Sequence, residues 1–212
     1  TTDTKNIGLD FGFFNNKLTG AMNYYYNQTE ELLITKALPP SAGLNNPILN
    51  VGKIRNSGVE VEINWADSKG GFDYNIGMNF STTKNKVVEL ADKGQVLYGE
   101  GLKYGTEHFP TQTRVGKPIG AFYLYKTNGL FQSNEEARQY VNADGDEYQP
   151  FADAGDIRYV DVNGDGYIDD DDKVYCGSGI PTLEVNLNFS AGYKGFDLSV
   201  VLGSAWGHKI YN

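Results

Sequence analysis

Residues 183–202, LEVNLNFSAGYKGFDLSVVL, carry the clearest folding signal in this chain. Apolar residues alternate with polar or small ones, as in a β-strand with one apolar face. The apolar set before the turn is Leu183, Val185, Leu187, Phe189, Ala191 and Tyr193. Lys194-Gly195 supplies a tight turn, and the alternation then resumes from Phe196 to Leu202. The stretch therefore predicts a β-hairpin whose strands are about ten residues long.

The same alternation occurs in two further pairs of segments. Residues 7–13 and 18–26 flank Asn15-Asn16, and residues 59–65 and 72–80 flank the polar stretch 67–71. The apolar positions are Ile7, Leu9, Phe11, Phe13, Leu18, Met22, Tyr24, Tyr26, Val59, Val61, Ile63, Trp65, Phe72, Tyr74, Ile76, Met78 and Phe80. We therefore expect at least three antiparallel hairpins that share one apolar face.

Strand length and loop asymmetry favour one β architecture. Strands of about ten residues exceed the 5–6 typical of soluble domains and match a tilted crossing of a bilayer. The turns are short, whereas the other connections are long, at 28–51, 84–117 and 132–180. Aromatic residues also gather toward the strand ends, as in an interfacial girdle. The pattern predicts an all-β, antiparallel transmembrane β-barrel segment with long extracellular loops. A soluble β-sandwich with an aromatic core is the alternative.

Composition excludes several classes of function. The net charge of −9 argues against nucleic acid as a partner, because clustered Lys and Arg drive such binding. Cys176 is the only cysteine, so neither an internal disulfide nor a thiolate zinc cluster can form. No apolar run approaches the roughly 18 residues of a transmembrane helix. No nucleophile elbow, P-loop or zinc spacing occurs, and His108 and His208 are far apart, so we do not expect an enzyme.

The long connection at about 132–180 is an acidic insert. Residues 134–172 hold 13 acidic and two basic side chains, so this segment carries −11 and the rest of the chain +2. Within it, residues 161–172 have the spacing of a calcium-binding loop, with oxygen donors at positions 1, 3, 5, 7, 9 and 12 and glycine at 6. The expected ligands are Asp161, Asn163, Asp165, Tyr167 through its carbonyl, Asp169 and Asp172.

The predicted calcium site departs from an EF-hand in two ways. Asp172 stands where an EF-hand has glutamate, and its shorter side chain weakens bidentate capture. The flanking residues 157–160 and 173–176 are not helical in pattern. We therefore expect Ca²⁺ to act as a structural staple for the loop. A solvated acidic loop without metal is the alternative.

Other loop residues predict a short helix and a recognition surface. Ser133 and Glu136 have capping-box spacing, which predicts a helix over 135–141. The loop aromatics Tyr98, Tyr104, Phe109 and Tyr148 suit stacking on sugars and on peptides alike.

Three segments together resemble a known family. They are NIGLDFGFFNNKLTGAMNYYYNQTEELL at 6–33, NVGKIRNSGVEVEINW at 50–65, and GDIRYVDVNGDGYIDDDDKVYCGSGIPTLEVNLNFSAGYKGFDLSVVLGSAWGHKIYN at 155–212. They are similar, in this order, to the SusC/RagA family of TonB-linked (TonB-dependent) outer-membrane transporters. The resemblance implies the C-terminal part of a 22-stranded barrel plugged by an N-terminal domain. It also implies uptake of oligosaccharides (glycan uptake) or peptides beneath a SusD-like surface lipoprotein, with energy from the TonB complex.

Arithmetic indicates a fragment of such a protein. Twenty-two strands of about ten residues need about 220 residues before any loop is added. We therefore expect residues 1–212 to be one part of the receptor barrel in the cell outer membrane, with lipid against residues such as Ile7, Leu9, Val61, Ile63, Leu187 and Phe189.

Two other hypotheses stay open. The first is a soluble, calcium-dependent carbohydrate-binding β module, in which loop tyrosines stack on sugar rings. The second is a complete small barrel of about eight strands that serves as an anchor.

Overall fold

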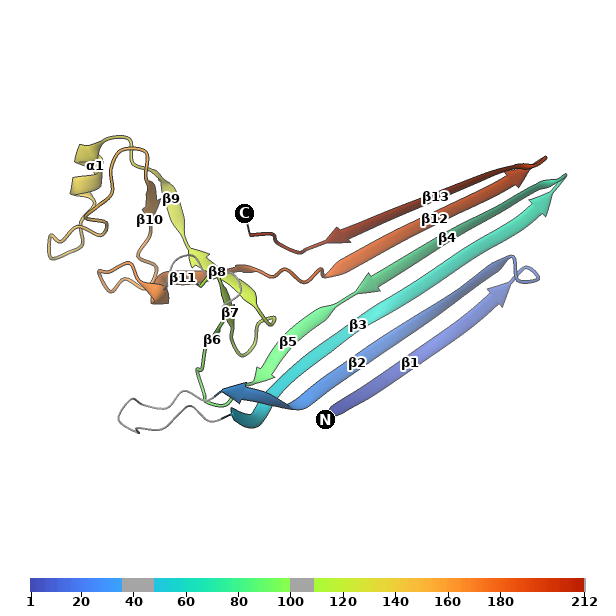
Figure 1. The fold of residues 1–212 in the computed structure, drawn as a ribbon, viewed down its shortest axis with the longest axis horizontal. Helices are drawn as coiled ribbons and strands as arrows, with labels where there is room; N and C mark the ends of the chain where they lie inside the picture. The colour runs from blue at the N-terminus through green and yellow to red at the C-terminus, as the bar shows by residue number, and fades with distance from the viewer. Residues whose placement is uncertain (36–47, 100–108, 212) are drawn as a thin grey trace.

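The computed structural model describes residues 1–35, 48–99 and 109–211. Its largest element is a sheet of long antiparallel strands in the order β1-β2-β3-β4-β12-β13, with β5 paired to β3 off this path (Figure 1). These strands are β1 (Thr2–Phe13), β2 (Leu18–Thr35), β3 (Ile48–Lys69), β4 (Phe72–Thr82), β5 (Lys84–Glu89), β12 (Leu183–Tyr193) and β13 (Phe196–Trp206). The predicted antiparallel hairpins are confirmed, and among the described residues the sheet stays open, with β1 and β13 at its edges.

The three hairpin turns lie together at one end of the sheet (Figure 1). Two of them are two-residue turns with positive φ at both positions, Gly70-Gly71 and Lys194-Gly195. Such turns match the twist of the strands that they join, which is why glycine occupies them. The third turn, between β1 and β2, also has positive φ at Asn15 and Asn16, residues that tolerate this conformation. The predicted turn 67–71 is shorter than expected because β3 continues to Lys69.

The other end of the sheet carries the long connections (Figure 1). Here a second sheet has the order β11-β8-β7-β6, and β9 pairs with β10. The bounds are β6 (Leu97–Tyr98), β7 (Thr111–Thr113), β8 (Ala121–Tyr125), β9 (Thr127–Leu130), β10 (Ile157–Tyr159), β11 (Lys173–Gly177), α1 (Asn134–Gln139) and the 3₁₀ helix η3 (Asp170–Asp172). We call the described residues within 84–182 the loop assembly.

Two small hydrophobic clusters hold the loop assembly. Val87 and Leu90 are buried, with Ile54 and Leu97 packed against them. Phe131, Ala137 and Ala152 form the second cluster, against which Tyr140 packs. The first cluster lies where β3 and β5 meet the loop assembly, and β1, β2, β4, β12 and β13 contribute no buried hydrophobic side chain among the described residues.

Two loop predictions were wrong at their boundaries. The expected loop 28–51 begins inside β2, which continues to Thr35, and ends inside β3, which begins at Ile48. Alternation fails after Thr29 because the register shifts there and Glu31 has positive φ, so the period was lost while the pairing continued. The expected loop 84–117 likewise begins with a strand, β5. Strands of 18 and 22 residues result, longer than the ten predicted.

The predicted capped helix is confirmed. Ser133 is the N-cap of α1, and its hydroxyl accepts a hydrogen bond from the Glu136 backbone N–H at 3.1 Å. The helix ends at Gln139, two residues before the expected 141. No helix in the described part of the chain is both long and apolar enough to cross a membrane.

Candidate functional site

The long sheet has one apolar face, set by the register of its strands. Ile7 lies opposite Tyr24, Leu187 opposite Met78 and Phe189 opposite Ile76, and each such pair shares a face. All six residues predicted to meet lipid lie on this face, which we call the apolar face. Several of its side chains are well exposed, including Ile7 at 76%, Leu9 at 64% and Leu202 at 57%. A contiguous apolar surface of this kind needs lipid or protein against it.

Aromatic side chains border the apolar face near the short turns. The rings of Phe14 and Trp65 lie 6.0 Å apart, and those of Phe72 and Tyr193 lie 6.3 Å apart. Trp65 Nε1–H donates a hydrogen bond to the Tyr74 hydroxyl at 3.3 Å. Rings with an apolar body and a polar tip suit the boundary between lipid and water.

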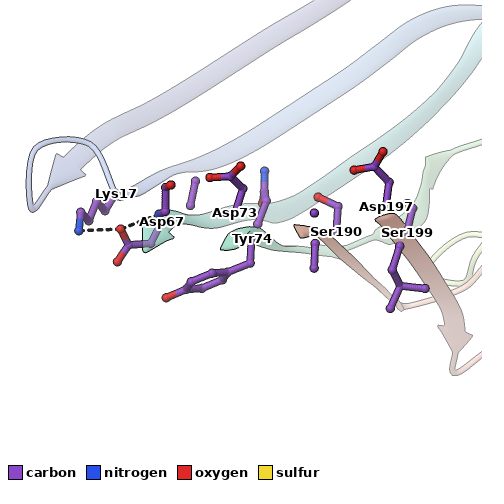
Figure 2. Close-up of a pocket in the computed structure, with 13 residues that line it drawn as sticks. Lys17, Asp67, Asp73, Tyr74, Ser190, Asp197 and Ser199 are labelled. Carbon is purple, nitrogen blue, oxygen red and sulfur yellow. Dashed lines mark hydrogen bonds and ion pairs between the residues drawn. The ribbon is translucent and has the colours of Figure 1, made fainter. Parts of the chain in front are cut away.

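The opposite, polar face carries Asn, Asp, Glu and Ser side chains. Near the short turns the sheet forms an open groove of about 880 Å³. Figure 2 shows Asp73, Ser190 and Asp197 on one side of the sheet there and Tyr74 on the other. Lys17 and Asp67, whose Nζ and Oδ1 atoms form an ion pair of 2.7 Å, also line the groove (Figure 2). This wet face suits a water-filled lumen or a polar protein surface.

An aromatic pocket of about 460 Å³ lies in the loop assembly. Its lining is Phe109, Pro110, Tyr123, Leu124, Tyr125, Tyr159, Lys173 and Tyr211. The rings of Tyr125 and Tyr159 lie 5.3 Å apart, and Lys173 Nζ lies 5.2 Å from the Tyr125 ring centroid. Aromatic rings that line a pocket can stack on sugar rings or on aromatic peptide side chains.

Electrostatics keep Tyr125 neutral. Its hydroxyl donates to Asp170 Oδ1 at 3.2 Å, and Asp170 also pairs with the buried Lys173 at 2.6 Å. Burial and the neighbouring negative charge of Asp170 raise the pKa of Tyr125 to about 12. Tyr125 is therefore a hydrogen-bond donor at every physiological pH.

The structure assigns the predicted loop aromatics to different places. Phe109 lines the aromatic pocket and packs on Tyr98 at 5.4 Å. Tyr148 lies elsewhere, 4.9 Å from Tyr140, and Tyr104 is outside the described residues. Sequence reasoning missed the tyrosines of β8 and β10, although alternation in 121–125 already placed Tyr123 and Tyr125 on one face.

The predicted calcium loop is wound around its own carboxylates. Asp161 accepts hydrogen bonds from the backbone N–H groups of Gly164 at 2.6 Å and Gly166 at 2.9 Å. Burial pushes the pKa of Asp161 up, but these N–H donors outweigh it, so the pKa lies below its ordinary value. Asn163 accepts from the Asp165 N–H at 2.9 Å, which continues the turn.

Asp172 closes the loop from the other side. Its side chain is fully buried, and it accepts from the N–H groups of Val162 at 2.7 Å, Asn163 at 3.3 Å and Asp169 at 2.8 Å. Tyr167 lies on the loop with its side chain 65% exposed. The described residues contain no group of three or more His, Cys, Asp or Glu side chains placed to hold a metal ion. Calcium binding here stays a prediction.

Comparison with known proteins identifies the family to which this β-sheet architecture belongs. The family model "TonB dependent receptor-like, beta-barrel" matches residues 1–205. TonB-dependent receptor P26 of Formosa agariphila is 31% identical, covering 100% of this chain and 21% of the relative. TonB-dependent receptor P3 of the same organism is 29% identical, over 100% of this chain and 21% of the relative. TonB-dependent receptor SusC of Bacteroides thetaiotaomicron is 26% identical, over 99% and 20%.

Solved structures share the fold. A structure of the RagAB peptide transporter superposes with a TM-score of 0.70 at 19% identity, covering 97% of this chain and 21% of that one. The RagAB peptide importer in its "open-open" state gives the same TM-score over 98% of this chain. The chain thus spans about a fifth of the length of the proteins that it matches.

Proposed function

Because this chain belongs to the TonB-dependent receptor-like β-barrel family, we propose that it forms part of the barrel wall of an outer-membrane importer. The relatives named above are TonB-dependent receptors, which are outer-membrane transporters and not enzymes. In the proposed orientation the apolar face meets lipid, the polar face lines the lumen, and the loop assembly lies outside the cell.

The observation that carries this proposal is the exposed apolar face bordered by aromatic rings. Each of β4, β12 and β13 has 11 residues, which span about 36 Å along the strand and about 28 Å in height at the usual tilt. That height fits the roughly 25 Å apolar band of outer-membrane barrels. A soluble module of this size would cover such a face.

The proposed cargo is an oligosaccharide or a peptide, captured with a SusD-like lipoprotein and moved with TonB-supplied energy. The SusC relative and the RagAB neighbour support the pairing and the energy source, and the name of the RagAB peptide transporter supports a peptide as one class of cargo. The aromatic pocket supports it independently, because aromatic rings can stack on either class of cargo.

Fractionation of the parent full-length protein, followed by protease treatment of intact cells, tests the proposal. We expect recovery in the outer membrane, with cleavage confined to 36–47, 90–117 and 132–180, the connections left once β2, β3 and β5 are taken out of the predicted loops. Recovery as a soluble monomer would refute the importer and leave the calcium-dependent carbohydrate-binding module.

We also propose that loop 161–172 binds Ca²⁺ as a structural staple. Its support is the ligand spacing of the sequence together with the tight turn that the hydrogen bonds from Gly164 and Gly166 to Asp161 hold in place. Asp161, Asn163, Asp165 and the Tyr167 carbonyl would hold the ion, with Asp169 and Asp172 completing the set. We expect millimolar Ca²⁺ to slow protease cleavage at 161–172 in the full-length protein, and a chelator to reverse this. Equal cleavage with Ca²⁺ and with Mg²⁺ would contradict a calcium site.

A further inference from the structure

A pocket of about 660 Å³ opens where the long sheet meets the loop assembly. It lies between β5, the turn at 116–118 and the segment that leads into β12. Three lysines line it, Lys84, Lys86 and Lys117, and no acidic side chain is among the described residues that do so. We call it the lysine pocket.

The three ammonium groups have no carboxylate partner in the described part of the chain. None of them forms an ion pair with a described residue, and Lys117 instead lies over the Tyr175 ring at 4.5 Å. The net charge of the chain is −9, whereas the lysine pocket has three positive side chains without an ion-pair partner among the described residues, so its local charge is opposite in sign to that of the chain. Such a cluster attracts an anion, and phosphate is the anion that several convergent ammonium groups bind well.

The strand register places two of these lysines just beyond the apolar face. Tyr24 lies opposite Val59 on that face, and both also line the lysine pocket. A step of two residues along β3, away from the short turns, leads from Val59 to Ser57, which lies opposite Lys84. A second such step leads to Arg55, which lies opposite Lys86. Side chains two residues apart share a face, so both lysines continue the apolar face outward by about 7 Å per step.

The change from apolar to cationic side chains crosses four neighbouring strands. Lys5 lies opposite Tyr26, which lies opposite Ser57, which lies opposite Lys84. Arg55, one step beyond, stacks on the Tyr26 ring at 5.1 Å. Cations at this level lie where lipid headgroups meet water, and their apolar stems can run along lipid.

We propose that the lysine pocket binds the phosphate group of a lipid in the outer leaflet. The acyl chains would lie against Tyr24 and Val59, and the phosphate would accept hydrogen bonds from Lys84, Lys86 and Lys117. This inference rests on the proposed membrane orientation, because only a barrel in lipid brings a headgroup to this level.

The test uses the full-length protein purified in a non-ionic detergent. Calorimetric titrations with a short-chain phosphatidic acid and with inorganic phosphate compare a lipid phosphate with a free one. The variant is K84Q/K86Q/K117Q. The matched control, K69Q/K93Q/K194Q, removes the same charge at lysines that do not line the pocket.

We expect phosphatidic acid to bind, and the pocket variant to weaken binding by about tenfold or more, since charge-assisted hydrogen bonds are the strong ones. The control should bind as the unchanged protein does. Equal affinity of variant and control would overturn the inference. Inorganic phosphate binding as tightly as phosphatidic acid would also overturn it, in favour of a free-phosphate site.

Recovery in the outer membrane separates this inference from the proposed function. If the unchanged protein is in the outer membrane but does not bind phosphatidic acid, only the lipid site fails. If it is not in the membrane at all, the importer fails as well. The pocket variant should still reach the outer membrane, because its substitutions lie outside the apolar face.

Discussion

Replacing Leu187 with arginine measures directly whether the apolar face meets lipid. Leu187 lies four residues from Leu183 and six from Tyr193, the two ends of β12. At about 3.3 Å per residue and the usual tilt, these are about 10 Å and about 15 Å from the two rims. Leu187 therefore lies near the middle of the apolar band.

A charge at this depth is costly because lipid cannot hydrate it. We expect Leu187→Arg to lower the free energy of unfolding of the full-length protein by about 2–4 kcal/mol. Ala191 is on the same face but only two residues from Tyr193, or about 5 Å from the rim, so Ala191→Arg should cost about 0–1 kcal/mol. Asn188 points to the polar face, and Asn188→Arg should lack the lipid penalty.

The assay is denaturant unfolding of the full-length protein in phospholipid vesicles, followed by tryptophan fluorescence. The order of stability should be Asn188→Arg and Ala191→Arg close to the unchanged protein, with Leu187→Arg well below both. If Leu187→Arg and Asn188→Arg were equally stable, the lipid-facing assignment would be refuted. If all three lost 2–4 kcal/mol, arginine itself would be disruptive in this strand, and depth in lipid would not be the cause.

Three further predictions concern the junction and the loop assembly. A Cβ at Gly58 would lie 1.8 Å from the Thr82 carbonyl oxygen of β4, so Gly58→Ala should cost about 1–3 kcal/mol in unfolding titrations. A Cβ at Gly179 would lie 3.9 Å from the Lys209 carbonyl oxygen, an ordinary contact distance, so Gly179→Ala should be near neutral. The raised pKa of Tyr125 means that its contribution to stability is full below pH 10 and is lost as the pH rises toward 12; tyrosinate absorbance of Tyr125→Phe should lack this late titration. Asp172→Asn loses an acceptor for buried N–H groups and should cost about 1–3 kcal/mol, while Asp171→Asn at an exposed position should not, as protease resistance of the loop can show.

Alternation was enough to predict the faces of the sheet. In β4, β12 and β13 every expected apolar residue lies on one face, because a period of two leaves no freedom once the register is fixed by tight turns. The same logic failed beyond Thr29, where the register shift breaks the period without ending the strand. A sequence pattern cannot distinguish that from a loop, since both lack periodicity.

The loop assembly was harder to predict, for a different physical reason. Its sites are built from side chains far apart in the chain, such as Tyr125 beside Tyr159 and Lys117 beside Tyr175. The residues of each pair meet only because the loops fold back on one another, and a local sequence pattern contains no information about such long-range contacts. The acidic motif was visible because its spacing is local, but the burial of Asp172 beneath three N–H groups was not.

The proposed position of the membrane explains why the strands differ in length. β12 needs only its 11 residues to cross about 28 Å, whereas β3, with 22 residues, covers about 56 Å in height at the same tilt. About half of β3 must therefore project beyond the apolar band, on the side away from the short turns. That half of β3 pairs with β5 and supports the loop assembly. Ser57, which lies opposite Lys84 at the start of the cationic level, is close to the midpoint of the whole strand β3. The lipid boundary inferred from charge and the boundary inferred from length thus agree at the same residue.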